Sequence, residues 1–456
     1  MNKVFKLNRG SLLCLIQLLV SILIYIHYPK RMEVSMPLFY ITFFLTIVST
    51  VTYFVYKKKK NYIDFDTLFI FICILICFFS TFFYNEDFYY LLFLNFRFDE
   101  SYINSGSLIS SIGLQSYFVG SLVPNSRKRT ELPVGMPQYI INTGVISLCI
   151  LIGILLFFAV GGIDYYKSMY QDDVKSGSAL STYVILLITV LSIVLIATEF
   201  YNSQICSNYK IKKSSICILV IFCVLLMFSG NRTSASHIIL PIIGLYALFK
   251  RKLNLRYFFV FLFGSILLMW LFQNIRSNRD IEMSGTNPVM ILRDLTIPSR
   301  ATFAAMEYVD SHGYTYGETM CGGLVGIIPL FASTFNFNMD KLGSAEVLTI
   351  ETYDNLRANT SRMTGLGTTV ITDIYLSFGV LGVIVLMFFL GYFVCVNQSK
   401  SLNLDYYSLI IYTALLSNSV FLARASFTHP VRYILWALVV AYIFRKKIVI
   451  RTSQQN

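Results

Sequence analysis

Charged residues are scarce in this sequence. Only 13% of its 456 residues are Asp, Glu, Lys or Arg, whereas a soluble globular domain has about 25%. The four histidines, His27, His237, His312 and His429, show no zinc-ligand spacing. Neither a phosphate-binding glycine loop nor a nucleophile elbow is present. The sequence therefore excludes an ordinary soluble enzyme, and we expect neither a cofactor nor a bound metal.

Long apolar runs, by contrast, are abundant. Apolar residues make up 56% of the sequence, aromatic residues make up 16%, and the mean hydropathy is +0.65. A helix needs about 20 mostly apolar residues to cross a bilayer. We therefore predict an all-α polytopic integral membrane protein with about 12 transmembrane helices. The expected spans are 11–28, 37–56, 67–84, 105–123, 138–160, 180–200, 214–229, 234–249, 257–274, 367–395, 404–422 and 431–444.

Basic residues orient these spans. Cytoplasmic loops of membrane proteins are enriched in Lys and Arg, and 22 of the 37 basic residues fall in short segments on one side of the predicted topology. Those segments include both ends of the chain, so we place both termini in the cytoplasm. The formal net charge of +13 is then a topology signal, and no nucleic-acid partner is expected.

One predicted loop is much longer than the others. It covers residues 275–366 on the outer, periplasmic side, between transmembrane helices one to nine (1–274) and helices ten to twelve with a cytoplasmic tail (367–456). Featureless loops longer than about 12–15 residues are uncommon, so we expect structure within it. Short helices are predicted from Asn287-Pro288, at 299–310 and at 345–357, and an interfacial or re-entrant segment at 322–331.

Arginine is concentrated on the outer side. The inner segments carry 15 Lys and 7 Arg, whereas the outer ones carry 4 Lys and 11 Arg. A planar guanidinium binds phosphate through two hydrogen bonds at once, which favours a lipid-linked phosphate as the ligand; snorkelling and ion pairs with loop acids are the alternative. Arg232 stands out, because it lies in a tight turn between apolar spans. The outer arginines are Arg31, Arg97, Arg232, Arg276, Arg279, Arg293, Arg300, Arg357, Arg362, Arg424 and Arg432.

The acidic residues give less evidence of function than the arginines do. Asp64-Phe65-Asp66 matches the D-x-D pattern with which nucleotide-sugar transferases hold a metal and a diphosphate. The short cytoplasmic loop has no nucleotide-binding domain, so acids at the start of a helix are the favoured interpretation. Within the spans the two clear acids are Glu199 and Asp373, fewer than a proton- or sodium-coupled transporter would show.

Three segments of the second half resemble Wzy-type O-antigen polymerases. SHGYTYGETMCGGLVGIIP at 311–329 is similar to part of their long outer loop, where a glycine-tyrosine-glycine pattern precedes an apolar segment ending in Ile-Pro. GLGTTVITDIYLSFGVLGVIVLMFFLG at 365–391 resembles the span after that loop, and GNRTSA at 230–235 resembles the arginine turn of the family. Leu330 stands where many members have Arg, and Asp373 where they usually have Glu.

This resemblance implies processive glycosyl transfer at the outer face of a bacterial inner membrane. The donor would be a growing glycan on undecaprenyl diphosphate, and the acceptor a single repeat unit on the same lipid. The acceptor's hydroxyl would attack the donor's anomeric carbon, and undecaprenyl diphosphate would leave. The lipid bilayer surrounds such an enzyme, and a chain-length regulator is an additional candidate partner. An O-antigen ligase of similar layout and a lipid-linked oligosaccharide flippase or other transporter are the alternatives.

The resemblance also suggests roles for individual residues. Fixed cations that meet the charge developing on a leaving diphosphate lower the barrier, so no metal is required, and the attacking hydroxyl benefits from a general base. The base candidates are, in order, Asp373, Glu318 and His312, with His429 as a reserve. Tyr314 and Tyr316 would stack on the acceptor sugar. The expected ligands of the diphosphate are Arg232, Arg276, Arg279, Arg293, Arg300, Arg357 and Arg362.

Overall fold

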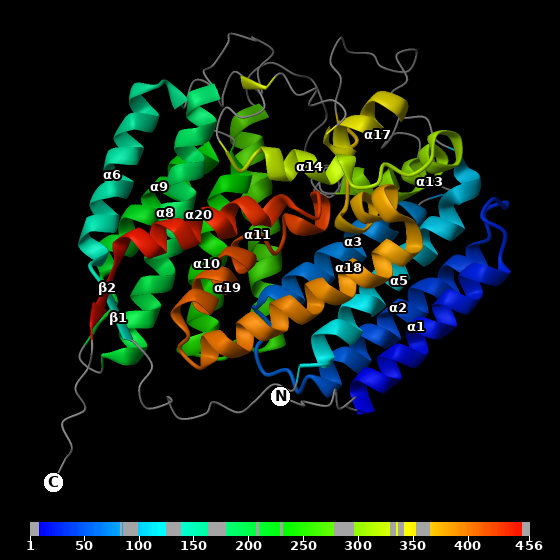
Figure 1. Ribbon diagram of the computed structural model, residues 1–456, viewed down its shortest axis with the longest axis horizontal. Coiled ribbons are helices and arrows are strands. Elements are labelled where there is room, and N and C mark those ends of the chain that lie inside the picture. Colours follow the sequence, from blue (N-terminus) through cyan, green and yellow to red (C-terminus); the bar gives the residue numbers. More distant parts are fainter. Residues whose placement is uncertain are drawn as a thin grey trace.

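Helices dominate the structure (Figure 1). The computed structural model describes residues 9–82, 84, 99–124, 138–162, 179–206, 209–228, 231–277, 296–328, 334–335, 342–352 and 365–448. Each expected span overlaps a helix, as the backbone groups of a lipid-exposed segment must be satisfied within that segment. These helices are α1 (Arg9–His27), α2 (Met36–Tyr56), α3 (Phe65–Phe82), α5 (Ile103–Leu122), α6 (Thr143–Ala159), α8 (Ala179–Ile205), α9 (Lys213–Phe228), α10 (Arg232–Phe249), α11 (Leu255–Ser277), α18 (Val370–Leu402), α19 (Tyr406–Ser417) and α20 (His429–Phe444).

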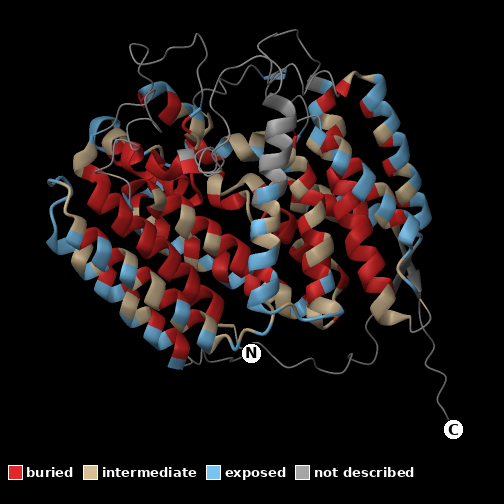
Figure 2. Ribbon diagram, turned by 180° about the vertical axis from the view of Figure 1, so that it is seen from behind, coloured by how far each residue is buried: buried red, intermediate tan, exposed pale blue. Residues whose placement is uncertain are grey.

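The predicted class of polytopic helical membrane protein is confirmed. Among the described residues, α1, α2, α3, α8, α10 and α18 are long and apolar enough to cross a bilayer by length and composition. Helices α6, α9, α19 and α20 and the start of α11 are shorter apolar segments. Large apolar side chains are exposed on the outward faces of the peripheral helices, and the buried residues face inward (Figure 2). The number of crossings stays a prediction.

Two short strands add to the helices. Strand β1 (Gln138–Ile141) pairs antiparallel with β2 (Arg445–Ile448), which follows α20. The span expected to start at 138 therefore begins later, at Thr143, where the side chain of Asn142 accepts a hydrogen bond from the N–H of Gly144. The expected start was wrong because a short apolar run such as QYII does not distinguish a strand from a helix.

The helices form two groups that lie side by side. Helices α1, α2, α3, α5 and α18 make up one group, and α6, α8, α9, α10 and α20 the other (Figure 1). Helix α19 packs against both α18 and α10 and so joins the groups. The start of α1 and strand β2 lie toward the end of the molecule away from α13, α14 and α17 (Figure 1).

The closest helix packing is between α5 and α18. A Cβ atom at Gly120 would overlap the carbonyl oxygen of Phe388, and one at Gly391 would overlap that of Tyr117. Small residues thus let the two backbones touch, which is how helices associate where the surrounding lipid is as apolar as their side chains. Every residue of α5 is buried, including Gln115 and seven other polar residues, so this helix is sheltered from lipid by its neighbours.

A kink in α18 fixes the glycine-tyrosine-glycine segment. Gly379 has φ 63° and ψ −160°, which interrupts the helix. The N–H groups of Thr315 and Tyr316 donate to the carbonyl oxygens of Leu376 and Ser377 just before the interruption, at 3.0 and 3.1 Å. The segment turns at Gly313 and Gly317, where φ is 84° and 91°. Glycine adopts such values without strain, so the pattern seen in the sequence has a conformational cause.

The described part of the long loop lies over one end of the bundle. It contains η2 (Ile297–Arg300), α13 (Ala301–His312), α14 (Glu318–Val325) and α17 (Ser344–Thr352). Helix α13 overlaps the helix expected at 299–310 and α17 overlaps the one expected at 345–357, of which residues 353–357 lie outside the described residues. Helix α14 lies across the helix ends (Figure 1). Trp436 of α20 donates to the carbonyl of Ile327, and Thr428 donates to that of Met320, each at 2.8 Å. The helix start expected at Asn287-Pro288 lies outside the described residues.

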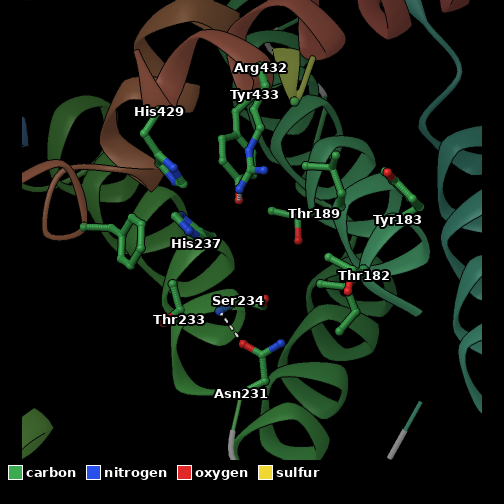
Figure 3. Close-up of a pocket in the computed structure, with 14 residues that line it drawn as sticks. Thr182, Tyr183, Thr189, Asn231, Thr233, Ser234, His237, His429, Arg432 and Tyr433 are labelled. Carbon is green, nitrogen blue, oxygen red and sulfur yellow. Dashed lines mark hydrogen bonds between the residues drawn. The ribbon is translucent and has the colours of Figure 1, made fainter. Parts of the chain in front are cut away.

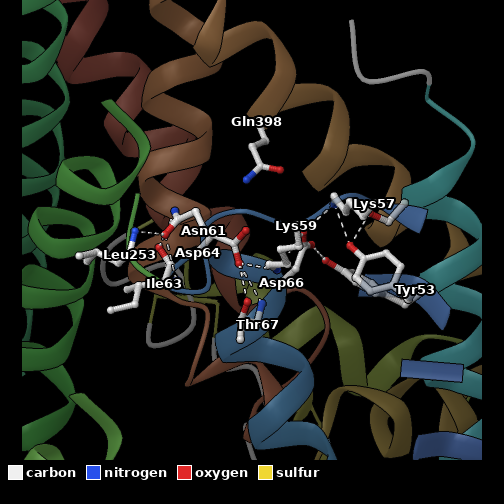
Figure 4. A network of polar contacts seen from close by, with 12 residues as sticks. Tyr53, Lys57, Lys59, Asn61, Ile63, Asp64, Asp66, Thr67, Leu253 and Gln398 are labelled. Carbon is white, nitrogen blue, oxygen red and sulfur yellow. Dashed lines mark hydrogen bonds and ion pairs between the residues drawn. The ribbon is translucent and has the colours of Figure 1, made fainter. Parts of the chain in front are cut away.

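The D-x-D acids belong to a buried polar cluster between α2 and α3 (Figure 4). Asp64 accepts from the N–H of Thr67 at 3.0 Å and so caps α3, and Lys59 lies 2.7 Å from its carboxylate. The Nζ atom of Lys57 lies 2.6 Å from the carboxylate of Asp66. The interpretation as acids at a helix start is confirmed, and both carboxylates already have cationic partners.

Candidate functional site

A cavity opens where several helices begin. Its volume is about 230 Å³, and it lies between the first turns of α8, α10 and α20 and the end of α14 (Figure 3). We call it the helix-end pocket. Its lining residues are Thr182, Tyr183, Ile185, Leu186, Thr189, Asn231, Thr233, Ser234, His237, Gly326, Phe421, His429, Arg432 and Tyr433.

His237 is held in one tautomer. Its Nδ1 lies 2.9 Å from the carbonyl oxygen of Ser417, the last residue of α19. The hydroxyl of Ser417 donates to the carbonyl of His237 at 2.7 Å, so this hydroxyl oxygen can only accept from Nδ1. Both neighbours of Nδ1 are therefore acceptors, and Nδ1 carries the hydrogen. The side chain is 2% exposed, and Nε2 has no hydrogen-bond partner among the described residues.

Helix α20 contributes a second imidazole and a guanidinium. His429 is its first residue, and Arg432 follows within the first turn. The Nη2 atom of Arg432 donates to the hydroxyl of Tyr433 at 3.3 Å, and its guanidinium lies 5.0 Å from the centre of that ring. Within the described part of the chain, the buried Nε of Arg432 and Nε2 of His429 lack hydrogen-bond partners. Two buried nitrogen atoms beside the pocket thus lack the hydrogen bonds that such atoms normally make.

The wall between these groups is aromatic. The ring of His237 lies 5.0 Å from that of Tyr433 and 5.8 Å from that of Phe421. His429 packs 4.6 Å from Phe421 and 5.6 Å from Tyr433. Four rings from three segments therefore fix each other's orientation, so the imidazoles are preorganised rather than mobile.

The electrostatics of the pocket favour an anion. Asn231 caps α10, and its side-chain oxygen accepts from the N–H of Ser234 at 3.0 Å, which leaves its amide NH₂ as a donor (Figure 3). Helix N-termini carry partial positive charge, and α8, α10 and α20 all begin beside the pocket. The lining residues among the described ones include no Asp or Glu. A phosphate would meet donors and no competing carboxylate.

Of the predicted residues, Arg232 lies next to the pocket, and Asp373 lies in the first turn of α18. Arg232 is the first residue of α10 and is half-buried, between the lining residues Asn231 and Thr233. Asp373 is fully buried in the first turn of α18, and its Oδ2 accepts from the N–H of Phe427 at 2.9 Å. Neither side chain lines the pocket.

Other predicted residues lie at the opposite end of α14 or elsewhere. Glu318 begins α14, so it is separated from Gly326 by about 12 Å of helix. His312 is exposed and stacks on Tyr308 at 4.6 Å. The rings of Tyr314 and Tyr316 lie 6.4 Å apart, and Tyr316 is 78% exposed.

The remaining arginines are not brought together by the described structure. Arg300 is buried at the end of η2, which packs against α3. Arg276 lies near the end of α11, but its side chain is outside the described part. Arg279, Arg293, Arg357 and Arg362 lie outside the described residues.

The sequence assigned no role to His237. It placed Arg432 only among the outer arginines and His429 only as a reserve candidate for the base. The signal available was indirect: each lies in the first turns of an apolar helix that the predicted topology starts on the outer side. The histidines were set aside because their spacing suits no zinc site, yet catalytic histidines need no regular spacing. Within the described residues, no three His, Cys, Asp or Glu side chains converge as metal ligands would.

Comparison with known proteins identifies the family of the chain. The sequence profile of the family "O-antigen polysaccharide polymerase Wzy" matches residues 11–453. The chain belongs to this family. Family membership and the apolar helices make it a multi-pass bacterial membrane protein with the role of an O-antigen repeat-unit polymerase. No curated protein and no solved structure matches the chain.

Proposed function

We propose that this chain joins undecaprenyl-diphosphate-linked repeat units at the periplasmic face of the inner membrane, with both termini in the cytoplasm. The helix-end pocket would hold the diphosphate of the donor. One observation carries the proposal: a pocket without a described carboxylate that presents the unpartnered Nε of Arg432, the amide of Asn231 and three helix N-termini.

The pocket's donors suit the reaction. When the acceptor's hydroxyl attacks the anomeric carbon, the bond from that carbon to the phosphate oxygen breaks, and its electron pair stays on the departing diphosphate. Donors already fixed around this oxygen stabilise the new charge without reorganising. The guanidinium of Arg432 and the N-terminus of α10 would supply this stabilisation, so we expect no metal requirement. Arg232, beside the pocket, would contact the second phosphate.

The predicted residues on the loop would act on the sugars. Tyr314 and Tyr316 lie at the far end of α14 and expose their rings, so they are suited to stack on units of a glycan that extends from the pocket. The loop arginines Arg276, Arg279, Arg293, Arg357 and Arg362 remain proposed ligands of the second lipid diphosphate, and Arg300 would support the loop. A chain-length regulator remains a proposed partner.

The test replaces Arg432. We expect Arg432→Gln to abolish long glycan ladders on gels at normal protein level and to weaken binding of undecaprenyl diphosphate to the purified protein at least tenfold. Arg251→Gln is the matched control, because Arg251 is exposed at the other end of α10. Unchanged ladders in Arg432→Gln would overturn the assignment of the pocket.

The same experiments separate the alternatives. Loss of a polymerase leaves a single repeat on the lipid core, whereas loss of a ligase leaves none. Purified protein that elongates lipid-linked repeat units in detergent would exclude a flippase.

A further inference from the structure

The pocket contains a base whose lone pair has no described partner. In a neutral imidazole, one nitrogen carries hydrogen and the other accepts. The acceptors around Nδ1 of His237 place its hydrogen there, so the free lone pair is on Nε2. This atom is buried and without a hydrogen-bond partner within the described residues. An unsatisfied buried acceptor is unfavourable, and a substrate hydroxyl would satisfy it.

The groups that face His237 favour a neutral imidazole in the empty pocket and allow a positively charged one when a diphosphate is bound. From α20 they are His429, Arg432 and Tyr433, and from α19 the carbonyl and hydroxyl of Ser417, while Tyr183 of α8 lines another part of the pocket. Two cations side by side would be unfavourable in the empty pocket, so the imidazole starts neutral beside Arg432. Once a diphosphate occupies the pocket, its negative charge offsets a second positive charge.

We propose that Nε2 of His237 is the general base that takes the proton of the attacking sugar hydroxyl. This role rests on the polymerase function proposed above. The acceptor oxygen forms its bond to the anomeric carbon and gives its proton to Nε2, while the bond from that carbon to the phosphate oxygen breaks. The electron pair of the broken bond leaves with undecaprenyl diphosphate. The imidazolium is then held by the Ser417 carbonyl on one side and the diphosphate on the other, and it returns its proton to water when the lipid leaves.

His237 takes the role of general base that the sequence favoured for Asp373. The carboxylate of Asp373 is outside the pocket lining and accepts from the N–H of Phe427. We assign it a positioning role, because Phe427 lies two residues before His429 at the start of α20.

The decisive variant is His237→Asn. The amide nitrogen of Asn occupies nearly the position of Nδ1, so the bond to the Ser417 carbonyl is retained and the base is lost. We expect the elongation rate to fall at least 100-fold, measured with lipid-linked repeat units extracted from the same bacterium lacking this chain. Binding of undecaprenyl diphosphate and the Tm of the purified protein should change little. The wild-type rate should fall as the pH is lowered, because an imidazolium cannot accept a proton, and the residual rate of His237→Asn should lack this dependence.

Failure of the proposed role of His237 can be distinguished from failure of the proposed polymerase function. Elongation by His237→Asn within threefold of wild type, or a residual rate with the wild-type pH profile, would overturn the role of His237 alone. Loss of rate together with a lower Tm, restored by His237→Gln, would show a structural role and would also overturn it. If the wild-type protein does not elongate the repeat units, the proposed function fails, and the role of His237 with it.

Discussion

The carboxylate of Asp373 in α18 accepts a hydrogen bond of 2.9 Å from the backbone N–H of Phe427. Phe427 lies in the turn that leads into α20, which carries His429 and Arg432. The next residue, Thr428, donates to the carbonyl of Met320 in α14. One acid near the outer end of α18 thus holds the turn from which two pocket residues project.

This contact gives a prediction for Asp373. An amide oxygen can accept from the same N–H, so Asp373→Asn should keep most of the elongation rate, whereas Asp373→Ala should lose the bond. We expect Asp373→Ala to lower the free energy of unfolding by about 1.5–3 kcal/mol and to shorten the glycan ladders. Both variants are compared by gel and by Tm. If Asp373→Asn is as inactive as a base-less variant while stable, Asp373 is the base and the positioning role is wrong.

Close packing of α5 against α18 gives a second prediction. A methyl group at Gly120 would overlap the carbonyl of Phe388, so Gly120→Ala should force the helices apart. The expected loss is about 1–3 kcal/mol, seen as a lower Tm and a lower yield of folded protein. The control is Gly264→Ala in α11, where no atom lies within 4 Å of the added carbon. Equal Tm values for the two variants would contradict the packing.

A third prediction concerns the kink at Gly379. Alanine there meets the strain of a positive φ, and its Cβ would lie 2.8 Å from the hydroxyl of Tyr314. Gly161 also has a positive φ, 71°, in open space, so Gly161→Ala is the control for a methyl group at a positive φ without a steric neighbour. We expect Gly379→Ala to cost more than Gly161→Ala and to make the 313–317 segment more susceptible to protease. Identical Tm changes would show that Tyr314 does not pack on the kink.

The buried pair of Lys57 and Asp66 gives a fourth prediction. Removing the cation by Lys57→Met leaves the fully buried carboxylate of Asp66 with Tyr117 and the more distant Lys59. Breaking a buried ion pair costs about 3–5 kcal/mol, so a large fall in Tm is expected. The double variant Lys57→Met/Asp66→Asn removes both charges and should recover part of the loss. A double variant less stable than the single one would contradict this explanation.

Much of the fold followed from the sequence. Apolar runs located the helices, because a bilayer core accepts only segments that satisfy their own backbone hydrogen bonds. The expected limits of α2 at 37–56 agree closely with Met36–Tyr56. The arginine turn, the 311–329 segment and the 365–391 segment indicated the polymerase family, which the match over residues 11–453 confirms. Residues 138–141 were misplaced because their apolar pattern suits a strand equally well.

The site depended on the tertiary structure. His237 and His429 are far apart in the sequence, and they meet because α19 and α20 fold back against α10 and α8. Hydropathy indicates which segments lie within the membrane, but it does not indicate which residues pack against each other. The tautomer of His237 depends on a carbonyl at residue 417, and the carboxylate of Asp373 accepts a hydrogen bond from the N–H of residue 427. The sequence by itself determined a helical membrane protein of the polymerase family; only the packing of helix ends decided which nitrogen atoms share a pocket.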